Sequence, residues 1–587
     1  MDAAAASWLF WPLALWLTFL PKKIFFSKPH RFFLPAATTL FSMGYLFLLV
    51  MEYYFFEEFN SRFNAVAVDY LIYPHEVFVN IWDGYPVVPF LAGCLLAAAL
   101  IYWAGRRYLA KTWQFHLPLK SRALFLAAWG IFWLAGTRSA SFSSTRWSHN
   151  RVLNEVSGNS LYSLVYAAYT HHLDFGAFYR TIPKNEAYGR TRKILGVQKA
   201  IFDAQADSIE RLIPGRSKPK PANLVLILVE SFGSEFWGAF GRNPSLTPYM
   251  DELAKQGLLF TNLYACGNRT VRGLEGTLSS FPPLPGDSIV KRHLSDHVST
   301  LARTLKTANY RTLFLYGGRG MFDGMRSYAL KNGFERFIEQ KDFSDPGFTT
   351  IWGVSDEDLF RRSIEEFREF NRQGRSFFGA VLTVSNHKPY TYPTGRIAED
   401  PQERRRENAV KYTDWALGEF FRLARQEPFF NNTVFAVVAD HGARVYGSQT
   451  IPIHSYEIPL VILSPGIKQA KTIDTLGGSL DVGPTLLGLL GLKYRSVFFG
   501  RDLLAIPKKD GQAVLHHNRD IGLFRRGRMV VLGLNKTVEF FQMDTAARAL
   551  SPSPRQDPGD TELERDAIAI YQTADDLYTH RQFRLRD

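Results

Sequence analysis

The sequence predicts an α/β protein in which a transmembrane helix bundle precedes a domain built on a mostly parallel sheet flanked by helices. Two observations lead to this fold class. Long apolar stretches are confined to residues 1–140, whereas short apolar runs alternate with helical patterns from residue 221 onward, as in sheets covered on both faces. One run, 224–229, stops at Glu230. Ligands bind beyond the carboxyl ends of such strands, although a lone carboxylate there is ordinarily a surface acid.

Composition narrows the classes of function. The 587 residues are 46% hydrophobic and 15% aromatic, which is high for a soluble enzyme, and carry a formal net charge of +14. Such a charge suits nucleic acid, an anionic membrane surface or an anionic substrate. No helix-turn-helix, finger or stacking-sheet signature is found, so we expect no nucleic-acid partner. Two cysteines, Cys94 and Cys266, predict neither a disulfide framework nor a cysteine metal site.

The amino-terminal 140 residues are predicted to cross a membrane several times. Four apolar stretches lie at 8–20, 32–51, 87–104 and 123–135, the first and last being short for a span of about 20 residues. A fifth stretch, 63–82, fits either an interfacial helix or another span. Basic residues fill the first and third loops and acidic residues the second, which predicts that the first and third are cytoplasmic. An even number of spans then places the rest of the chain outside the cytoplasm.

We expect four regions along the chain: membrane helices in 1–140, an extracytoplasmic linker in 141–220 with a helix near 157–172, a catalytic domain in 221–505, and a carboxyl-terminal subdomain and tail in 506–587. A Pro-rich basic hinge at 211–220 marks the main boundary. The domain's expected strands are 224–229, 258–264, 312–316, 377–384, 433–438 and 460–463. Its expected helices are 248–256, 270–279, 301–307, 356–372, 407–425 and 482–490. Further strands at 529–534 and 537–541 and a helix after 561 belong to the last region.

Chemically reactive residues follow several of these elements. Thr270 begins a predicted helix, where a hydroxyl beside free backbone amides suits attack on a phosphate or sulfate ester; alone it would pass for a helix cap. Asp440 and His441 follow a buried strand. Together, Glu230, Thr270, Asp440 and His441 offer one divalent ion four oxygen and nitrogen ligands.

Several histidines are further candidates for the same site. His387 follows another predicted strand and could bind a phosphate oxygen or protonate a leaving alkoxide, although a loop histidine with purely structural contacts is an equally ordinary interpretation. His454 is a weaker candidate, and the pair His516 and His517 is weaker still.

A series of motifs runs through residues 223–500: Leu228-Val-Glu-Ser-Phe232, Thr247-Pro248, Asn268-Arg-Thr-Val-Arg-Gly273, Phe281-Pro-Pro-Leu-Pro-Gly286, Trp352-Gly-Val-Ser-Asp-Glu357, Ser385-Asn-His387, Ala439-Asp-His-Gly442 and Asp481-Val-Gly-Pro-Thr485. Through these motifs the sequence resembles the alkaline phosphatase superfamily, with its sulfatase-type domain. Within that superfamily it is similar to the lipoteichoic acid synthases and the periplasmic glucan phosphoglycerol transferases. The several-span bundle of that group matches residues 1–140.

The resemblance implies a phosphoglycerol transferase in the bacterial inner membrane, multi-pass, with its catalytic domain in the periplasm. Thr270 would take phosphoglycerol from a phosphatidylglycerol-like lipid and pass it to a glycan or glycerol phosphate acceptor. Glu230, Thr270, Asp440 and His441 would hold one divalent metal. Mn²⁺ is the first choice for this metal, and Mg²⁺ and Zn²⁺ are the alternatives. Substrate contacts are implied for His387, which is also a catalytic candidate, and for Arg272 and Arg326.

The sequence departs from the gram-positive synthases between Tyr316 and Tyr328, where those enzymes carry a His-Gly and a Trp-x-Arg. Here Arg326 is assigned the arginine role, and the departure favours the gram-negative branch. Because of this departure, the alternative is a phosphoethanolamine transferase that acts on lipid A or another envelope acceptor. A sulfatase is disfavoured because Thr270-Val-Arg-Gly lacks the Cys/Ser-x-Pro-x-Arg context of formylglycine formation. A non-catalytic glycan sensor is disfavoured by the intact ligand types.

Overall fold

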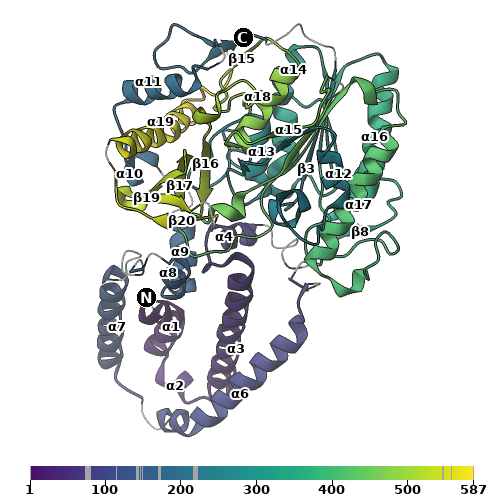
Figure 1. Cartoon of the computed structure of the whole chain (residues 1–587). Coiled ribbons are helices and arrows are strands. Elements are labelled where there is room, and N and C mark those ends of the chain that lie inside the picture. Colours follow the sequence, from purple (N-terminus) through teal and green to yellow (C-terminus); the bar gives the residue numbers. More distant parts are fainter. Residues whose placement is uncertain are drawn as a thin grey trace. The chain divides into compact units, whose positions relative to one another are not determined.

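The computed structural model describes residues 2–72, 78, 81–82, 84–113, 116–139, 145, 147–148, 150–169, 174–197, 199–215, 222–464, 466–544, 548–556 and 558–585. The chain forms two compact units. The first comprises Met1–His171 with Tyr446–Ser448, and the second comprises His172–Val445 with Gln449–Asp587. Figure 1 labels the helices and strands of both.

The first unit is helical. Its helices are α1 (Asp2–Phe19), α2 (Lys22–Phe25), α3 (Lys28–Phe59), α4 (Ala65–Ile72), α6 (Val87–Thr112), α7 (Leu119–Ser139), α8 (Arg151–Val156) and α9 (Ser160–Tyr169). Helix α3 packs against α6, and α1 packs against α7. The guanidinium of Arg122 in α7 donates to the carbonyls of Leu17 at 3.0 Å and Leu20 at 2.8 Å. These bonds satisfy carbonyls that the end of α1 leaves without helical partners.

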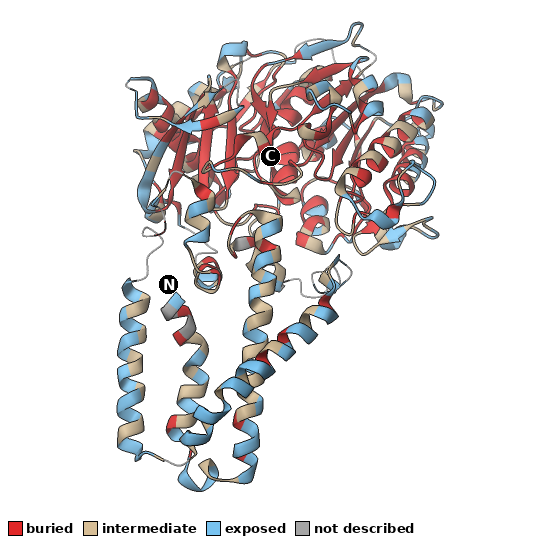
Figure 2. Ribbon diagram, turned by 60° about the horizontal axis from the view of Figure 1, so that its bottom comes forward, coloured by how far each residue is buried: buried red, intermediate tan, exposed pale blue. Residues whose placement is uncertain are grey.

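Two helices of the described chain are long and apolar enough to cross a membrane: Lys28–Phe59 and Val87–Lys111, with mean hydropathies of 1.8 and 2.1. Only 6% and 11% of their apolar windows are buried, so they are not core helices of a soluble domain, and Figure 2 shows their exposed surfaces. Helix α1 supplies a shorter apolar segment, Ser7–Phe19. The chain is therefore a membrane protein. Of the predicted stretch 63–82, residues 73–77 and 79–80 lie outside the described residues.

An eight-stranded sheet forms the centre of the second unit, in the order β13-β4-β12-β11-β3-β10-β6-β7. All of its neighbouring strands pair in parallel except β12, which is antiparallel to both β11 and β4. The mostly parallel sheet is thus confirmed. Its strands are β3 (Asn223–Val229), β4 (Leu258–Phe260), β6 (Arg311–Tyr316), β7 (Arg336–Ile338), β10 (Phe377–Leu382), β11 (Thr433–Ala439), β12 (Leu460–Leu463) and β13 (Lys471–Ile473).

Helices accompany this sheet in the predicted alternation: α12 (Pro248–Ala254), α13 (Thr270–Ser279), α14 (Leu301–Thr307), α15 (Met325–Lys331), α16 (Asp356–Arg372), α17 (Arg406–Ala424) and α18 (Ser479–Leu489). Every residue of β3 and β11 is buried, as expected for central strands with both faces covered, and these strands are red in Figure 2. The short elements β7, β13 and α15 were not predicted.

A second sheet follows near the carboxyl terminus. Five antiparallel strands make it: β16 (Ala513–His517), β17 (Asp520–Arg525), β18 (Arg528–Gly533), β19 (Thr537–Asp544) and β20 (Ala549–Pro552). Helix α19 (Gly559–Thr579) packs against β17, β18 and α11 (Lys184–Leu195). The sequence predicted only the third and fourth strands. In the part predicted as a tail, Phe583 is buried.

The predicted hinge begins inside a small three-stranded sheet. Strand β2 (Arg211–Ile213) lies between β1 (Ile201–Phe202) and β15 (Tyr494–Ser496). The Arg211 side chain is buried and donates to the carbonyl of Phe498 at 2.9 Å, so this arginine is structural. Residues 216–221, with the predicted boundary at 220, lie outside the described residues.

Candidate active site

Three neighbouring strands at the middle of the sheet deliver the predicted site residues. The pairing of β3 with β11 ends at Val229 opposite Ala439. Glu230 and Asp440, the next residues of the two strands, therefore lie at the same edge of the sheet. Strand β10 pairs with the other side of β3, and His387 follows five residues after its end. Alignment of the carboxyl ends therefore brings together residues that are far apart in sequence.

Glu230, Asp440 and His441 form a compact cluster. One ligand atom from each lies within 4.8 Å of the others. The Nε2 of His441 is 3.6 Å from the Glu230 carboxylate and 3.5 Å from that of Asp440, and all three residues are buried. Two carboxylates and an imidazole at this spacing match the ligand types that hold divalent ions.

Hydrogen bonds around the cluster favour a cation at its centre. The Asp440 Oδ1 accepts from the backbone amides of Ser231 at 2.9 Å and His441 at 2.7 Å, while its Oδ2 is buried with no hydrogen-bond partner among the described residues. The Nδ1 of His441 lies 2.7 Å from the carbonyl of Gly442. A proton on Nδ1 would occupy that bond and leave the Nε2 lone pair for a ligand. The residues present thus fit a divalent metal.

Thr270, the first residue of α13, reaches the same cluster. Its hydroxyl donates to the Oε2 of Glu230 at 3.0 Å. The amino-terminal end of a helix offers unpaired amides and a positive dipole end, both of which suit a phosphate. The structure therefore brings the predicted nucleophile into contact with the predicted metal ligands.

His387 also lies beside the Glu230 carboxylate. Its Nε2 is 3.4 Å from the Oε2 that accepts from Thr270. The imidazole stacks on the indole of Trp352, with ring centroids 4.2 Å apart and planes at 20°, and the Trp352 Nε1 donates to the carbonyl of Lys388 at 2.7 Å. Trp352 thus fixes the orientation of His387. The sequence offered Trp352 only as part of a motif, without a role.

Buried polar residues hold the loop before His387. The side-chain amide of Asn386 donates to the Glu230 carbonyl at 2.9 Å. The Oδ1 of Asp356 accepts from the amides of Val384 at 3.2 Å and Ser385 at 3.1 Å. This carboxylate, which the sequence did not single out, links α16 to the loop and so helps to position His387.

The charges in the cluster oppose one another. Burial by itself would raise the pKa of Glu230, but the imidazoles of His387 and His441 outweigh it and hold that pKa below its usual range. Burial and the neighbouring Glu230 raise the pKa of Asp440. Burial would lower the pKa of His441, yet Asp440 and Glu230 raise it overall. Such opposed shifts are typical of functional sites.

Two arginines near the site were not predicted. Burial lowers the pKa of His387, and the positive charges of Arg406 and Arg269 add to that effect. Arg269 directly precedes Thr270, a position that could have signalled its role. Arg406 donates to the carbonyl of Ala443 and lies 5.0 Å from the Tyr390 ring. Only its place in a run of arginines was visible in the sequence.

The two arginines predicted to bind substrate have other contacts. Arg272 is buried, with its guanidinium 2.9 Å from the Glu275 carboxylate and 2.8 Å from the carbonyl of Leu284. Arg326 pairs with Glu339. Neither has a recorded hydrogen bond or ion pair to the metal-ligand cluster among the described residues, so the structure brings Glu230, Thr270, His387, Asp440 and His441 together without them.

A glycine sets the distance between the nucleophile's helix and a metal ligand. A Cβ on Gly273 would lie 2.6 Å from the Asp440 carbonyl oxygen and 2.8 Å from its Cβ. We expect Gly273→Ala to push α13 away from Asp440, lowering the free energy of unfolding by about 1–3 kcal/mol and weakening metal binding. Thermal unfolding with and without metal measures both effects.

The matched control for that variant is Gly189→Ala in α11, where an added Cβ meets nothing within 4 Å. An alanine at an open helical position is expected to stabilise by about 0.4–1 kcal/mol. Equal behaviour of the two variants would show that the close approach at Gly273 is not required.

Comparisons with known proteins agree with this geometry. The sulfatase family matches residues 222–492. Lipoteichoic acid synthase-like YvgJ of Bacillus subtilis (strain 168) is 26% identical over 326 residues, which are 50% of this chain and 52% of the relative. Phosphoglycerol transferase I of Xanthomonas campestris pv. campestris (strain B100) is 26% identical over 317 residues, 50% of this chain and 44% of the relative. The match thus spans about half the length of these curated relatives.

A solved structure matches more of the chain. A protein in the alkaline phosphatase superfamily from Vibrio parahaemolyticus is 34% identical, with a TM-score of 0.66, over 70% of this chain and 100% of the other. The chain belongs to the alkaline phosphatase superfamily.

Proposed function

We propose that this chain is a membrane-anchored, metal-dependent phosphotransferase that moves phosphoglycerol from a phosphatidylglycerol-type lipid to an extracytoplasmic glycan or polyglycerol phosphate. The observation that carries the proposal is the hydrogen bond of 3.0 Å from the Thr270 hydroxyl to Glu230, a member of the three-residue cluster. The names of two relatives, a lipoteichoic acid synthase-like protein and phosphoglycerol transferase I, support phosphoglycerol as the group transferred.

Each residue has a role in this proposal. Glu230, Thr270, Asp440 and His441 would hold one divalent ion, Mn²⁺ before Mg²⁺ or Zn²⁺, which when bound would lower the pKa of the threonine hydroxyl and offset the phosphate charge. The amides at the start of α13 bind the phosphate oxygens. His387, held by Trp352, carries a proton to and from the exchanging oxygens.

The transfer has two steps. The Thr270 hydroxyl gives up its proton to solvent, its Oγ1 bonds to phosphorus, and the phosphorus–oxygen bond to diacylglycerol breaks. The diacylglycerol oxygen leaves with a proton from His387. In the second step His387 takes the proton of an acceptor hydroxyl, the acceptor oxygen bonds to phosphorus, and Thr270 is released and protonated again. A covalent phosphothreonine thus links donor and acceptor.

Location supports a lipid donor. Helices α3 and α6 meet the criteria for crossing a membrane, and α1 and α7 complete the four spans proposed for a multi-pass protein of the bacterial inner membrane. The loop charges favour a periplasmic location for the second unit, where lipid headgroups and envelope glycans would both be available.

A phosphoethanolamine donor is the second candidate. In the segment that departs from the gram-positive synthases, Asp323 is buried, and one oxygen of its carboxylate lies 3.6 Å from Arg269, which directly precedes the nucleophile. A carboxylate at this position suits the ammonium of ethanolamine as well as the hydroxyls of glycerol.

Headgroup-labelled lipids test the donor. The purified full-length protein is incubated with labelled phosphatidylglycerol or phosphatidylethanolamine, and the mass added to Thr270 is measured. We expect a phosphoglycerol adduct from the first lipid and none from the second. The reverse result would replace the proposed donor, and absence of any adduct from either lipid would refute transfer through Thr270.

A further inference from the structure

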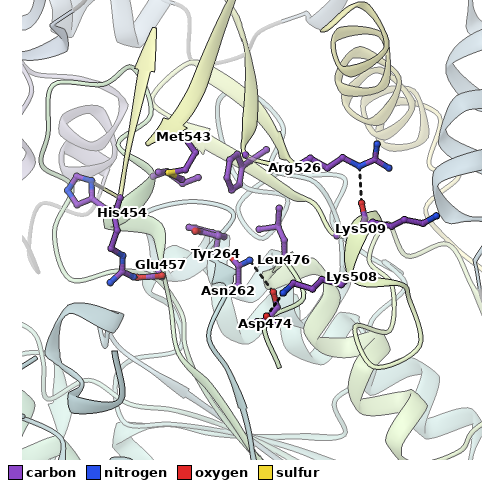
Figure 3. Close-up of a pocket in the computed structure, with 15 residues that line it drawn as sticks. Asn262, Tyr264, His454, Glu457, Asp474, Leu476, Lys508, Lys509, Arg526 and Met543 are labelled. Carbon is purple, nitrogen blue, oxygen red and sulfur yellow. Dashed lines mark hydrogen bonds and ion pairs between the residues drawn. The ribbon is translucent and has the colours of Figure 1, made fainter. Parts of the chain in front are cut away.

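A cavity in the second unit is lined by none of the residues of the metal-ligand cluster. Its volume is about 680 Å³, within the range of about 300–1,000 Å³ typical of small-ligand sites. It is formed where the carboxyl-terminal sheet meets the segments around β5 (Leu263–Tyr264) and the short helix η8 (Ile453–Tyr456). Figure 3 shows its lining side chains.

The floor of this cavity is apolar and rigid. Tyr264 and Phe524 meet edge to face, with ring centroids 5.8 Å apart. Both belong to a buried cluster with Ile453 and Leu476, against which Met543 packs. Because the floor is part of a buried core, the cavity is largely preformed, and its apolar and aromatic lining is typical of sites for small ligands.

The rim of the cavity is charged, with positive charge in excess. Four cationic side chains and two carboxylates line it: Lys508, Lys509, Arg526, Arg548, Glu457 and Asp474. Three of the four cations pair with carboxylates: Lys508 with Asp474, Arg548 with Glu457, and Arg526 with Asp510 outside the lining. The side chains of these three cations are 54–68% exposed, so each pair contributes little. The rim therefore favours an anionic ligand with hydrogen-bonding groups.

Two segments connect this cavity to the active site. Glu457 accepts from the Ser234 hydroxyl at 2.7 Å, and Ser234 lies four residues after Glu230. Tyr264 precedes Thr270 by six residues, which span at most about 20 Å of chain. The backbone at the cavity thus lies within about 20 Å of Thr270, a separation that a short chain-like ligand can span.

We propose that this cavity is the acceptor subsite and that it binds an anionic saccharide chain. The inference rests on the proposed function and adds to it the class of acceptor: sugar rings lie on the apolar floor, and negatively charged substituents pair with the rim cations. A free phosphate would use only the rim, and a lipid chain would use only the floor.

The test measures binding directly with the full-length Thr270→Ala protein, in which turnover is blocked. The probe is a short oligoglucoside carrying phosphoglycerol groups; the unsubstituted oligoglucoside and inorganic phosphate are the comparisons. We expect the substituted saccharide to bind tightest and Lys508→Gln to weaken it about fivefold, with a smaller difference at high salt. Met543→Trp, which fills the cavity, should weaken both saccharides.

Lys255→Gln is the matched control. Lys255 also pairs with an exposed carboxylate, that of Glu252, and its side chain is 71% exposed. It precedes β4, whereas the cavity residues Asn262 and Tyr264 follow that strand. We expect Lys255→Gln to bind the saccharides as tightly as the parent protein does. If Lys508→Gln and Met543→Trp also bind like the parent, or if inorganic phosphate binds as tightly as the saccharide, the acceptor subsite is refuted.

Transfer assays separate this inference from the function on which it rests. With Thr270 intact, Lys508→Gln should raise the acceptor KM about fivefold while leaving kcat and the formation of labelled Thr270 unchanged. Normal labelling with an unchanged acceptor KM would overturn the cavity's role alone. Absence of labelled Thr270 in the parent protein would overturn the proposed transfer, whatever the binding result.

Discussion

Thr270→Ala is expected to lower transfer by about four orders of magnitude or more, the scale of losses when a nucleophile is removed, and to abolish the covalent adduct. The reason is geometric, since the Thr270 hydroxyl donates to Glu230 at 3.0 Å and is the proposed nucleophile beside the cluster. Mass spectrometry of the protein after incubation with labelled lipid measures the adduct, and transfer to acceptor measures turnover.

Two variants make this result specific. Thr270→Ser keeps a hydroxyl and should retain the adduct at a reduced rate. Thr277→Ala removes a buried hydroxyl from the same helix, one that donates to the Gly273 carbonyl at 2.7 Å rather than to the cluster. It should cost about 1 kcal/mol of stability and keep the adduct. Metal-dependent transfer that persists in Thr270→Ala would remove Thr270 from the mechanism.

Glu230→Gln is expected to reduce metal affinity about a thousandfold, as when one partner of a buried charge pair is lost, and to abolish transfer while leaving the protein folded. The carboxylate lies between Thr270 at 3.0 Å and His387 at 3.4 Å. Its removal also relieves the repulsion that, after burial, raises the pKa of Asp440. It takes a favourable partner from His387 and His441 as well, so the metal response of each protein is measured against its own metal-free form.

Thermal unfolding with increasing metal measures this prediction apart from activity. Metal that binds only the folded state stabilises it by about 4 kcal/mol at a thousand times its dissociation constant. The parent's unfolding temperature should therefore rise with metal, whereas that of Glu230→Gln should not. Glu365→Gln, at a carboxylate whose side chain is 54% exposed, is the control and should respond like the parent. An undiminished metal response in Glu230→Gln would exclude this carboxylate as a ligand.

The central strands and helices could be predicted because their sequence patterns match the burial that the fold gives them. The apolar runs of β3 and β11 are buried at every residue, and helix α16 carries a serine cap, acidic first turn and apolar face that are all legible in sequence. The carboxyl-terminal sheet was largely missed. Strand β16 is buried throughout although it ends in two histidines, so tertiary packing, not composition, makes it a strand.

Within the site, we could predict the residues that directly follow a strand or begin a helix. We could not predict the residues whose contacts lie in a different loop. Glu230, Asp440 and His441 directly follow apolar runs. Arg406, by contrast, begins a helix and reaches the Ala443 carbonyl in another loop, a contact that depends on the fold of both segments. Arg326 was assigned a substrate role in the segment that departs from the gram-positive synthases. Its guanidinium pairs with Glu339, a partner 13 residues away that no local pattern indicates.

The pairing of β3 with β11 also constrains how the protein is made. The hydrogen bond between Ser231 and Asp440 joins residues 209 positions apart, so the metal-ligand cluster cannot form until the chain beyond His441 has left the ribosome. Helices of the first unit and the local segment around Thr270 are complete much earlier. During synthesis Thr270 is therefore present before Asp440 and His441, and the cluster forms only when the central parallel strands pair, a late event for contacts so distant in sequence.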